Sequence, residues 1–247
     1  MSMTSLARFA ALAVALVLCP ALRAVTFNYD FTGSPNPGSV GNSLIFTPVA
    51  GGPTITATAW YLDTAGTLRQ AALGIYANGL SVCSLGQICT NPNETDNSVY
   101  REFILLESST LIDPFTVRLY DGGSSSDTDA TYWLGGFNGQ TQALNLTGAT
   151  VAGLSALGFG SRNNDPGTDL CSGCFRSASL TPTGTGVTKL LFGAALTGDN
   201  NDSFLFTSLG ANSVPEPSSI LLFATAACGF LTILKRSRRS ANGSHNP

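Results

Sequence analysis

Short β-prone runs recur along this 247-residue chain, and turn-forming segments separate them. The runs combine Val, Ile, Thr and aromatic residues, whereas Gly, Asn, Asp and Ser fill the intervening segments. Two of the runs alternate apolar and polar residues, the period of a strand with one buried face. We therefore predict an all-β domain, a single antiparallel β-sandwich of jelly-roll type. The predicted strands are 25–31, 54–62, 100–107, 115–121, 188–195 and 203–209; helix and strand both remain open for 71–76 and 151–157.

Charged residues make up only 11% of the chain, against about 25% in typical soluble domains. Segment 25–212 holds 6 basic and 14 acidic residues, a net charge of −8. No basic face is available for nucleic acid, and an acidic surface is poorly suited to polyanions in general. Neutral glycans and divalent cations remain compatible with it.

The N-terminus has the pattern of a secretory signal peptide over residues 1–24. Arg8 provides a positive charge, and the ten-residue apolar segment after it is too short to span a bilayer. We expect signal peptidase to cut after Ala24, with Ala21 as the alternative. An uncleaved anchor and a lipoprotein site at Cys19 are further alternatives.

The C-terminus carries a second membrane-directed pattern. An apolar run of 17 residues, 218–234, is at the short limit for a membrane helix. A basic cluster directly after this run predicts a cytoplasmic end, so that the central segment lies outside. A disordered cytoplasmic tail, 240–247, would complete the chain. The cluster consists of Lys235, Arg236, Arg238 and Arg239, and the run is preceded by Val214, Pro215, Glu216 and Pro217.

This order of motif, short apolar helix and basic end resembles the PEP-CTERM sorting signal of Gram-negative bacteria, over residues 213–239. The resemblance implies insertion in the inner membrane, recognition by exosortase, and transfer to the cell surface or release. It also implies an association with exopolysaccharide and biofilm. The two prolines would hold an extended segment at the membrane surface, where a protease can read it. A diffuse likeness of the central segment to ectodomains that carry this signal implies an uncharacterised β-sandwich.

Four cysteines lie in the exported segment: Cys83, Cys89, Cys171 and Cys174. An even number in an oxidising compartment predicts disulfides. Three pairings are open, and the local pairs 83–89 and 171–174 are favoured because each lies in its own loop. A thioredoxin-like role and a four-cysteine zinc site are the alternatives.

Several loops carry clustered hard oxygen ligands of the kind that Ca²⁺ prefers. They would form one site if the loops meet and two if they do not. The alternative is that Asp and Asn here only make turns. The candidate ligands are Asp121, Asp127, Asp129, Asp199 and Asp202.

The chain's one histidine, His245, lies in the C-terminal tail, so the exported segment has no Ser-His-Asp or Cys-His machinery. A glycosidase would need only two facing carboxylates, for which Glu94, Glu102 and Glu107 are candidates. We predict no enzyme and no catalytic residues. The main prediction is an exported structural or adhesive surface protein, with a carbohydrate-binding module, a polysaccharide-active enzyme and a plain single-span membrane protein as alternatives. Candidate sugar-stacking residues are Trp60, Tyr61, Tyr132 and Trp133.

Overall fold

A computed structural model describes residues 24–33, 41–87, 94–121, 127–139, 144–167 and 173–214. Thr26–Val214 form one compact unit. The predicted signal peptide lies outside the described residues except for Ala24, and the predicted sorting signal except for Ser213 and Val214. Among the described residues, no helix has both the length and the apolar character needed to cross a membrane.

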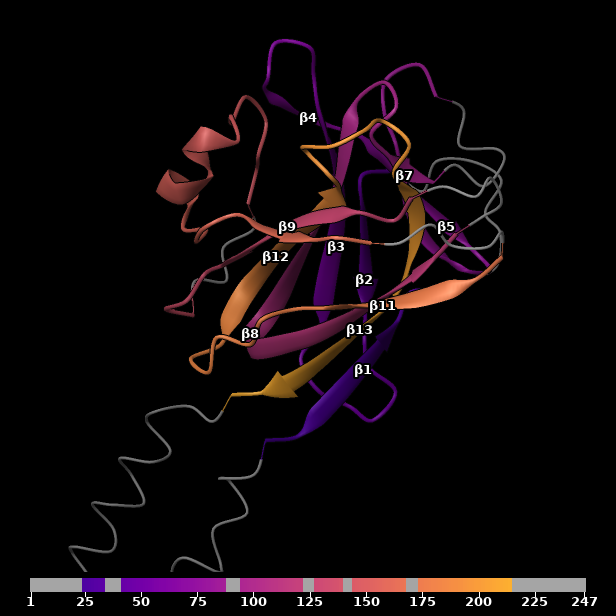
Figure 1. The fold of residues 1–247 in the computed structure, drawn as a ribbon. Helices are drawn as coiled ribbons and strands as arrows, with labels where there is room; N and C mark the ends of the chain where they lie inside the picture. Colours follow the sequence, from indigo (N-terminus) through magenta and orange to yellow (C-terminus); the bar gives the residue numbers. More distant parts are fainter. Residues whose placement is uncertain are drawn as a thin grey trace, which may run out of the picture. The chain divides into compact units, whose positions relative to one another are not determined.

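The described chain is mostly antiparallel β-sheet, so the all-β prediction is confirmed (Figure 1). Within the described ranges, the 3₁₀ helix Ala152–Leu157 interrupts the strands. The strands are β1 (Thr26–Asp30), β2 (Ser43–Phe46), β3 (Ile55–Leu62), β4 (Leu68–Gln70), β5 (Ala72–Tyr76), β6 (Gly79–Cys83), β7 (Thr95–Asp96), β8 (Arg101–Tyr120), β9 (Ala130–Gly135), β10 (Asn163–Asp165), β11 (Phe175–Ser179), β12 (Val187–Ala194) and β13 (Ser203–Ser213).

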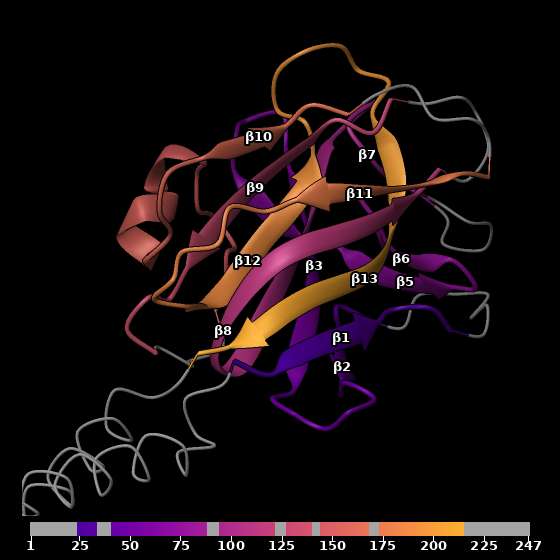
Figure 2. The same cartoon turned by 60° about the horizontal axis from the view of Figure 1, so that its bottom comes forward.

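Strand β8 organises the sheet because its two halves pair with different strands. Residues 101–108 pair with β3 on one side and, over part of this stretch, with β12 on the other. Residues 112–120 pair with β13, and 116–120 also pair with β11. Figure 2 shows β8, β13 and β1 lying side by side. The chain thus builds two groups of strands that share one long strand.

The sequence predicted two strands, 100–107 and 115–121, where the structure has the single strand β8. Pro114 cannot donate to a ladder, and its neighbours favour turns. The strand continues past it with a shift of register between Gly210 and Ala211 of β13, where β8 has one extra residue beside Pro114. Such a shift moves side chains to the other face of a strand. As a result, Ile112 and Val117 both enter the same apolar cluster although their spacing is odd.

The remaining predicted strands are all present, with bounds within one residue except that β13 continues four residues past the predicted end at 209. The two open segments are now assigned. Segment 71–76 contains β5, whereas 151–157 contains the 3₁₀ helix. In β1, Phe27 and Tyr29 are buried and their neighbours are exposed, as the alternating pattern predicted.

Two apolar clusters cover opposite faces of the strands β3, β8, β12 and β9. Cluster 1 includes Ile104 of β8 and Phe192 of β12, and it continues to Phe206 of β13. Cluster 2 includes the adjacent β8 residue Phe103 and residues of the segment 144–159. Because side chains alternate along a strand, neighbouring residues enter different clusters. The 3₁₀ helix lies beside β9 (Figure 1), where Gly135 and Phe159 form an isolated bridge.

Candidate metal centre

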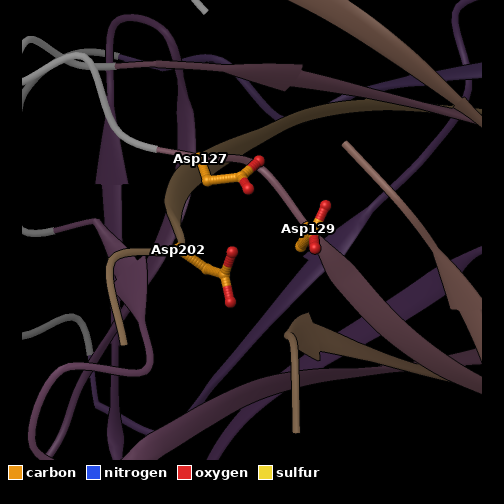
Figure 3. A group of neighbouring side chains, drawn as sticks. All are labelled: Asp127, Asp129 and Asp202. Carbon is orange, nitrogen blue, oxygen red and sulfur yellow. The ribbon is translucent and has the colours of Figure 1, made fainter. Parts of the chain in front are cut away.

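Three carboxylates from two loops meet at one end of the strands. Asp127 and Asp129 directly precede β9, and Asp202 directly precedes β13. One ligand oxygen from each lies within 4.8 Å of the others. Figure 3 shows the Asp127 and Asp202 side chains extending from neighbouring chain segments, with Asp129 beside them. We call these three residues the aspartate cluster.

Backbone contacts hold the two loops together. Asp127 and Asp202 form an isolated parallel bridge. The N–H of Ser203 donates to the carbonyl oxygen of Asp127 at 2.9 Å, and the N–H of Ala195 donates to that of Asp129 at 3.1 Å. The cluster geometry is therefore set by main-chain pairing and not by the side chains alone.

Asp202 is the buried member of the cluster, with only 1% of its surface exposed. The Asn97 side-chain amide donates to Oδ2 of Asp202, and Asn97 Oδ1 accepts from the Asp202 N–H at 3.1 Å. The same amide also donates to the carbonyl oxygens of Ala195 and Asp199, each at 3.2 Å. Among the described residues, Oδ1 of Asp202 has no hydrogen-bond partner. Asn97 thus holds one carboxylate oxygen of Asp202, and the other is left without a hydrogen bond among the described residues.

Burial and like charge act together on this carboxyl. Desolvation, followed by the negative charges of Asp129, Asp127 and Asp199, raises the pKa of Asp202 to about 7. The hydrogen bond from Asn97 opposes this rise. A hard cation among the three oxygens would offset both the desolvation and the charge repulsion that disfavour the ionised carboxylate.

The other two cluster residues are half-buried and make their own local contacts. Asp127 accepts from the Thr128 N–H at 2.7 Å, and Asp129 accepts from the Gly167 N–H. Close by, the Arg176 guanidinium donates to Thr128 Oγ1 at 2.6 Å and pairs with Asp165 at 2.5 Å.

Two predicted ligands, Asp121 and Asp199, lie outside the aspartate cluster. Asp121 is buried, and its N–H donates to the Cys174 carbonyl oxygen at 3.0 Å. Asp199 is exposed but close enough to raise the pKa of Asp202. Both loops that the sequence marked therefore contribute to a single cluster. It contains three of the five predicted ligands.

Asn97 is the site residue that sequence reasoning missed as a ligand-orienting group. It is fully buried, although its neighbours in the segment 94–100 have the composition of a solvated turn. No local signal marks it, because its partners are at the far end of the chain.

The predicted disulfide cysteines are only partly described. Cys83 and Cys174 are each disulfide-bonded, whereas Cys89 and Cys171 lie outside the described residues. The pairing remains a prediction.

The aromatic residues considered for sugar stacking are all core residues. Trp60 and Trp133 are 2% and 3% exposed and belong to cluster 2. Trp133 packs edge-on against Phe103 at 5.9 Å, and Trp60 Nε1 donates to Thr58 Oγ1 at 2.8 Å. Tyr61 and Tyr132 are likewise buried, in cluster 1.

The glutamates considered for glycosidase chemistry have separate roles. Glu102 is fully buried and accepts from the N–H groups of Ser84 and Asp96 at 3.1 and 3.0 Å. Glu107 accepts from the Leu144 N–H at 3.0 Å. The odd spacing places these two carboxyls on opposite faces of β8. Glu94 accepts from the Ser203 hydroxyl.

Comparison with known proteins adds no relative: no family model, curated protein or solved structure matches this chain. The molecule is therefore characterised by its own features, an antiparallel β domain with an acidic cluster at one end.

Proposed function

We propose that this chain is an exported cell-surface or matrix protein with a structural or adhesive role beside exopolysaccharide, and that it is not an enzyme. Exosortase would process it at the inner membrane of a Gram-negative bacterium. The observation that carries the proposal is the ordered C-terminal pattern of Val214–Pro217, a 17-residue apolar run and a basic end. A signal-peptide pattern at the opposite end supports the same direction of export.

Burial of the aromatic residues supports a structural role over a carbohydrate-binding one. Sugar-stacking platforms need accessible ring faces, whereas Trp60 and Trp133 have theirs inside cluster 2. The positions of Glu102 and Glu107 argue against a glycosidase built on that pair, because two catalytic carboxyls must face one substrate from one cleft. These two observations favour the structural or adhesive role.

For the fold, we infer closure into a β-sandwich of jelly-roll type around cluster 1. Residues of both strand groups contribute to this cluster, among them Ile104 and Phe192 from one and Phe206 and Leu209 from the other. Apolar inner faces of two stacked strand layers would produce this distribution.

The sorting proposal is tested by mass spectrometry of the surface fraction from an exosortase-containing host. We expect the surface form to yield no peptide from residues 221–234. The variant Glu216→Ala should retain these residues and remain with the membrane, because the Pro-Glu-Pro motif would no longer be recognised.

His245→Ala, a change in the tail beyond the basic cluster, is the matched control and should be processed like the wild type. An intact C-terminus on the surface form, unchanged by Glu216→Ala, would overturn the sorting proposal.

A further inference from the structure

We propose that Asp127, Asp129 and Asp202 bind one calcium ion that joins the loop before β9 to the start of β13. This inference goes beyond the proposed function and is independent of it, because it concerns a ligand of the β domain and not its export or sorting.

The first observation is the spacing of the carboxylates. Calcium takes oxygen ligands at about 2.3–2.6 Å, so two oxygens on one ion lie no more than about 5 Å apart. The three carboxylate oxygens lie within 4.8 Å of one another, inside this limit. The described loops thus place all three at positions that a single calcium ion can reach.

The second and independent observation is the oxygen that Asp202 leaves unused. This side chain is 99% withdrawn from solvent, since its exposed fraction is 1%. Within the described part of the chain, Oδ1 has no hydrogen-bond donor. A buried acceptor without a partner is costly and rare in native proteins. A cation in the aspartate cluster would supply the missing partner.

The third observation is that Asn97 holds Asp202 in place by two hydrogen bonds. Its amide donates to Oδ2 of Asp202, while its Oδ1 accepts from the backbone N–H of the same residue. These two contacts hold Asp202 through its side chain and its backbone, and they engage Oδ2 while Oδ1 has no donor among the described residues. In metal sites, a carboxylate that binds the ion is commonly held by a hydrogen bond from a neighbouring side chain, as Asp202 is held by Asn97 here.

The donor set decides the class of ion. The cluster offers carboxylate oxygens only, which suit Ca²⁺ and Mg²⁺ over the softer transition metals. Magnesium requires near-ideal octahedral geometry with oxygens at about 2.0–2.1 Å, which holds them within about 4.2 Å of one another. Ligands that come from two separate loops, without a rigid octahedral arrangement imposed by one element, suit the more variable calcium shell better.

The test is calorimetric titration of the EDTA-treated full chain, purified in detergent, with CaCl₂ and separately with MgCl₂. We expect one calcium ion per chain, with a Kd on the order of 10⁻⁴ M, as in extracellular calcium modules. At 10 mM CaCl₂, about a hundredfold excess, Tm should rise by roughly 5–10 °C. Magnesium should bind at least tenfold more weakly.

The variants Asp202→Asn and Asp129→Asn should each weaken calcium binding more than tenfold. Asp129 is half-buried, so Asp129→Asn keeps the test valid if Asp202→Asn does not fold. Asp199→Asn is the matched control: it removes a nearby charge without removing a cluster oxygen, and should change Kd less than threefold.

Absence of calcium binding to the wild type would overturn the proposal, as would binding that survives unchanged in Asp129→Asn. Magnesium binding as tight as calcium would overturn the assignment of the ion. A loss of binding in Asp199→Asn as large as in Asp129→Asn would show that general attraction to negative charge, and not the specific cluster, holds the ion.

Discussion

The two faces of the β3–β8–β12–β9 strands are covered in different ways. On one face, cluster 1 is built mainly from strands, and rings from β9 and β13 surround Phe192 of β12. On the other face, cluster 2 is smaller and is closed by the segment 144–159, which contains the 3₁₀ helix. The same strands therefore have one cover built from strands and one irregular cover.

Because both faces are covered, β9 and β12 are buried at every position. A sheet with one solvated face shows alternation, whereas a sheet covered on both faces shows continuous apolar runs. Burial on both faces also removes the tryptophans from the surface. An irregular segment is enough to do this, because it needs to shield only a few side chains.

The sharpest test of the comparison removes one large side chain from each cluster. Phe192→Ala should lower the free energy of unfolding by about 3–5 kcal/mol, because the surrounding strands cannot collapse into the cavity. Leu154→Ala should cost only about 2–3 kcal/mol, since the 3₁₀ segment can move inward. Urea unfolding followed by tryptophan fluorescence measures both. An equal or larger loss for Leu154→Ala would show that cluster 2 is the more rigid of the two.

A second test concerns a close approach on the cluster 2 face of β12. A Cβ atom at Gly193 would overlap the carbonyl oxygen of Glu102 and the ring of Phe103. Gly193→Ala should therefore cost roughly 1–3 kcal/mol, as overpacking typically does. The control is Gly153→Ala in the covering helix, where the new Cβ would lie 3.2 Å from Thr150 Oγ1.

Thermal unfolding of both glycine variants gives the comparison directly. Gly153→Ala should shift Tm by less than Gly193→Ala, because the Thr150 side chain can turn away whereas the β8 backbone cannot. The reverse order would mean that the helix is held more firmly than the strands.

A third test concerns a pH dependence that should differ between the two faces. Burial, with a smaller contribution from Asp96, raises the pKa of Glu102 to about 8. Burial also raises the pKa of Glu107 on the opposite face, but the Leu144 N–H and Lys189 oppose that rise. The native protein thus holds the Glu102 proton at pH values where the unfolded chain has released it.

Stability from Glu102 is therefore complete below the ordinary pKa of 4.5 and falls as pH rises to about 8. The slope should be at most ~1.4 kcal/mol per pH unit. Urea midpoints between pH 5 and pH 8 measure it. Glu102→Gln should flatten the wild-type decline, and Glu107→Gln should flatten it less. Parallel declines in the wild type and Glu102→Gln would refute this assignment.

Much of the secondary structure could be predicted from the sequence because strand formation depends on local pattern. The alternation in 25–31 and the β-branched and aromatic content of 54–62 predicted β1 and β3 within a residue. Short strands such as β2 and β10 were missed: β2 has only four residues, too few to show a period, and β10 has three residues, none of them apolar. The export and sorting patterns are also local, and they remain predictions on residues outside the described part of the chain.

The sequence by itself determined the β-prone runs, the acidic balance and the loops rich in Asp, because these depend on neighbouring residues alone. Only the tertiary structure decided that 100–107 and 115–121 are one strand, that Trp60 and Trp133 are buried, and that the loops bearing Asp127 and Asp202 meet. Each of these depends on contacts between distant segments. Strand pairing and register create those contacts, and no local pattern in the chain encodes them.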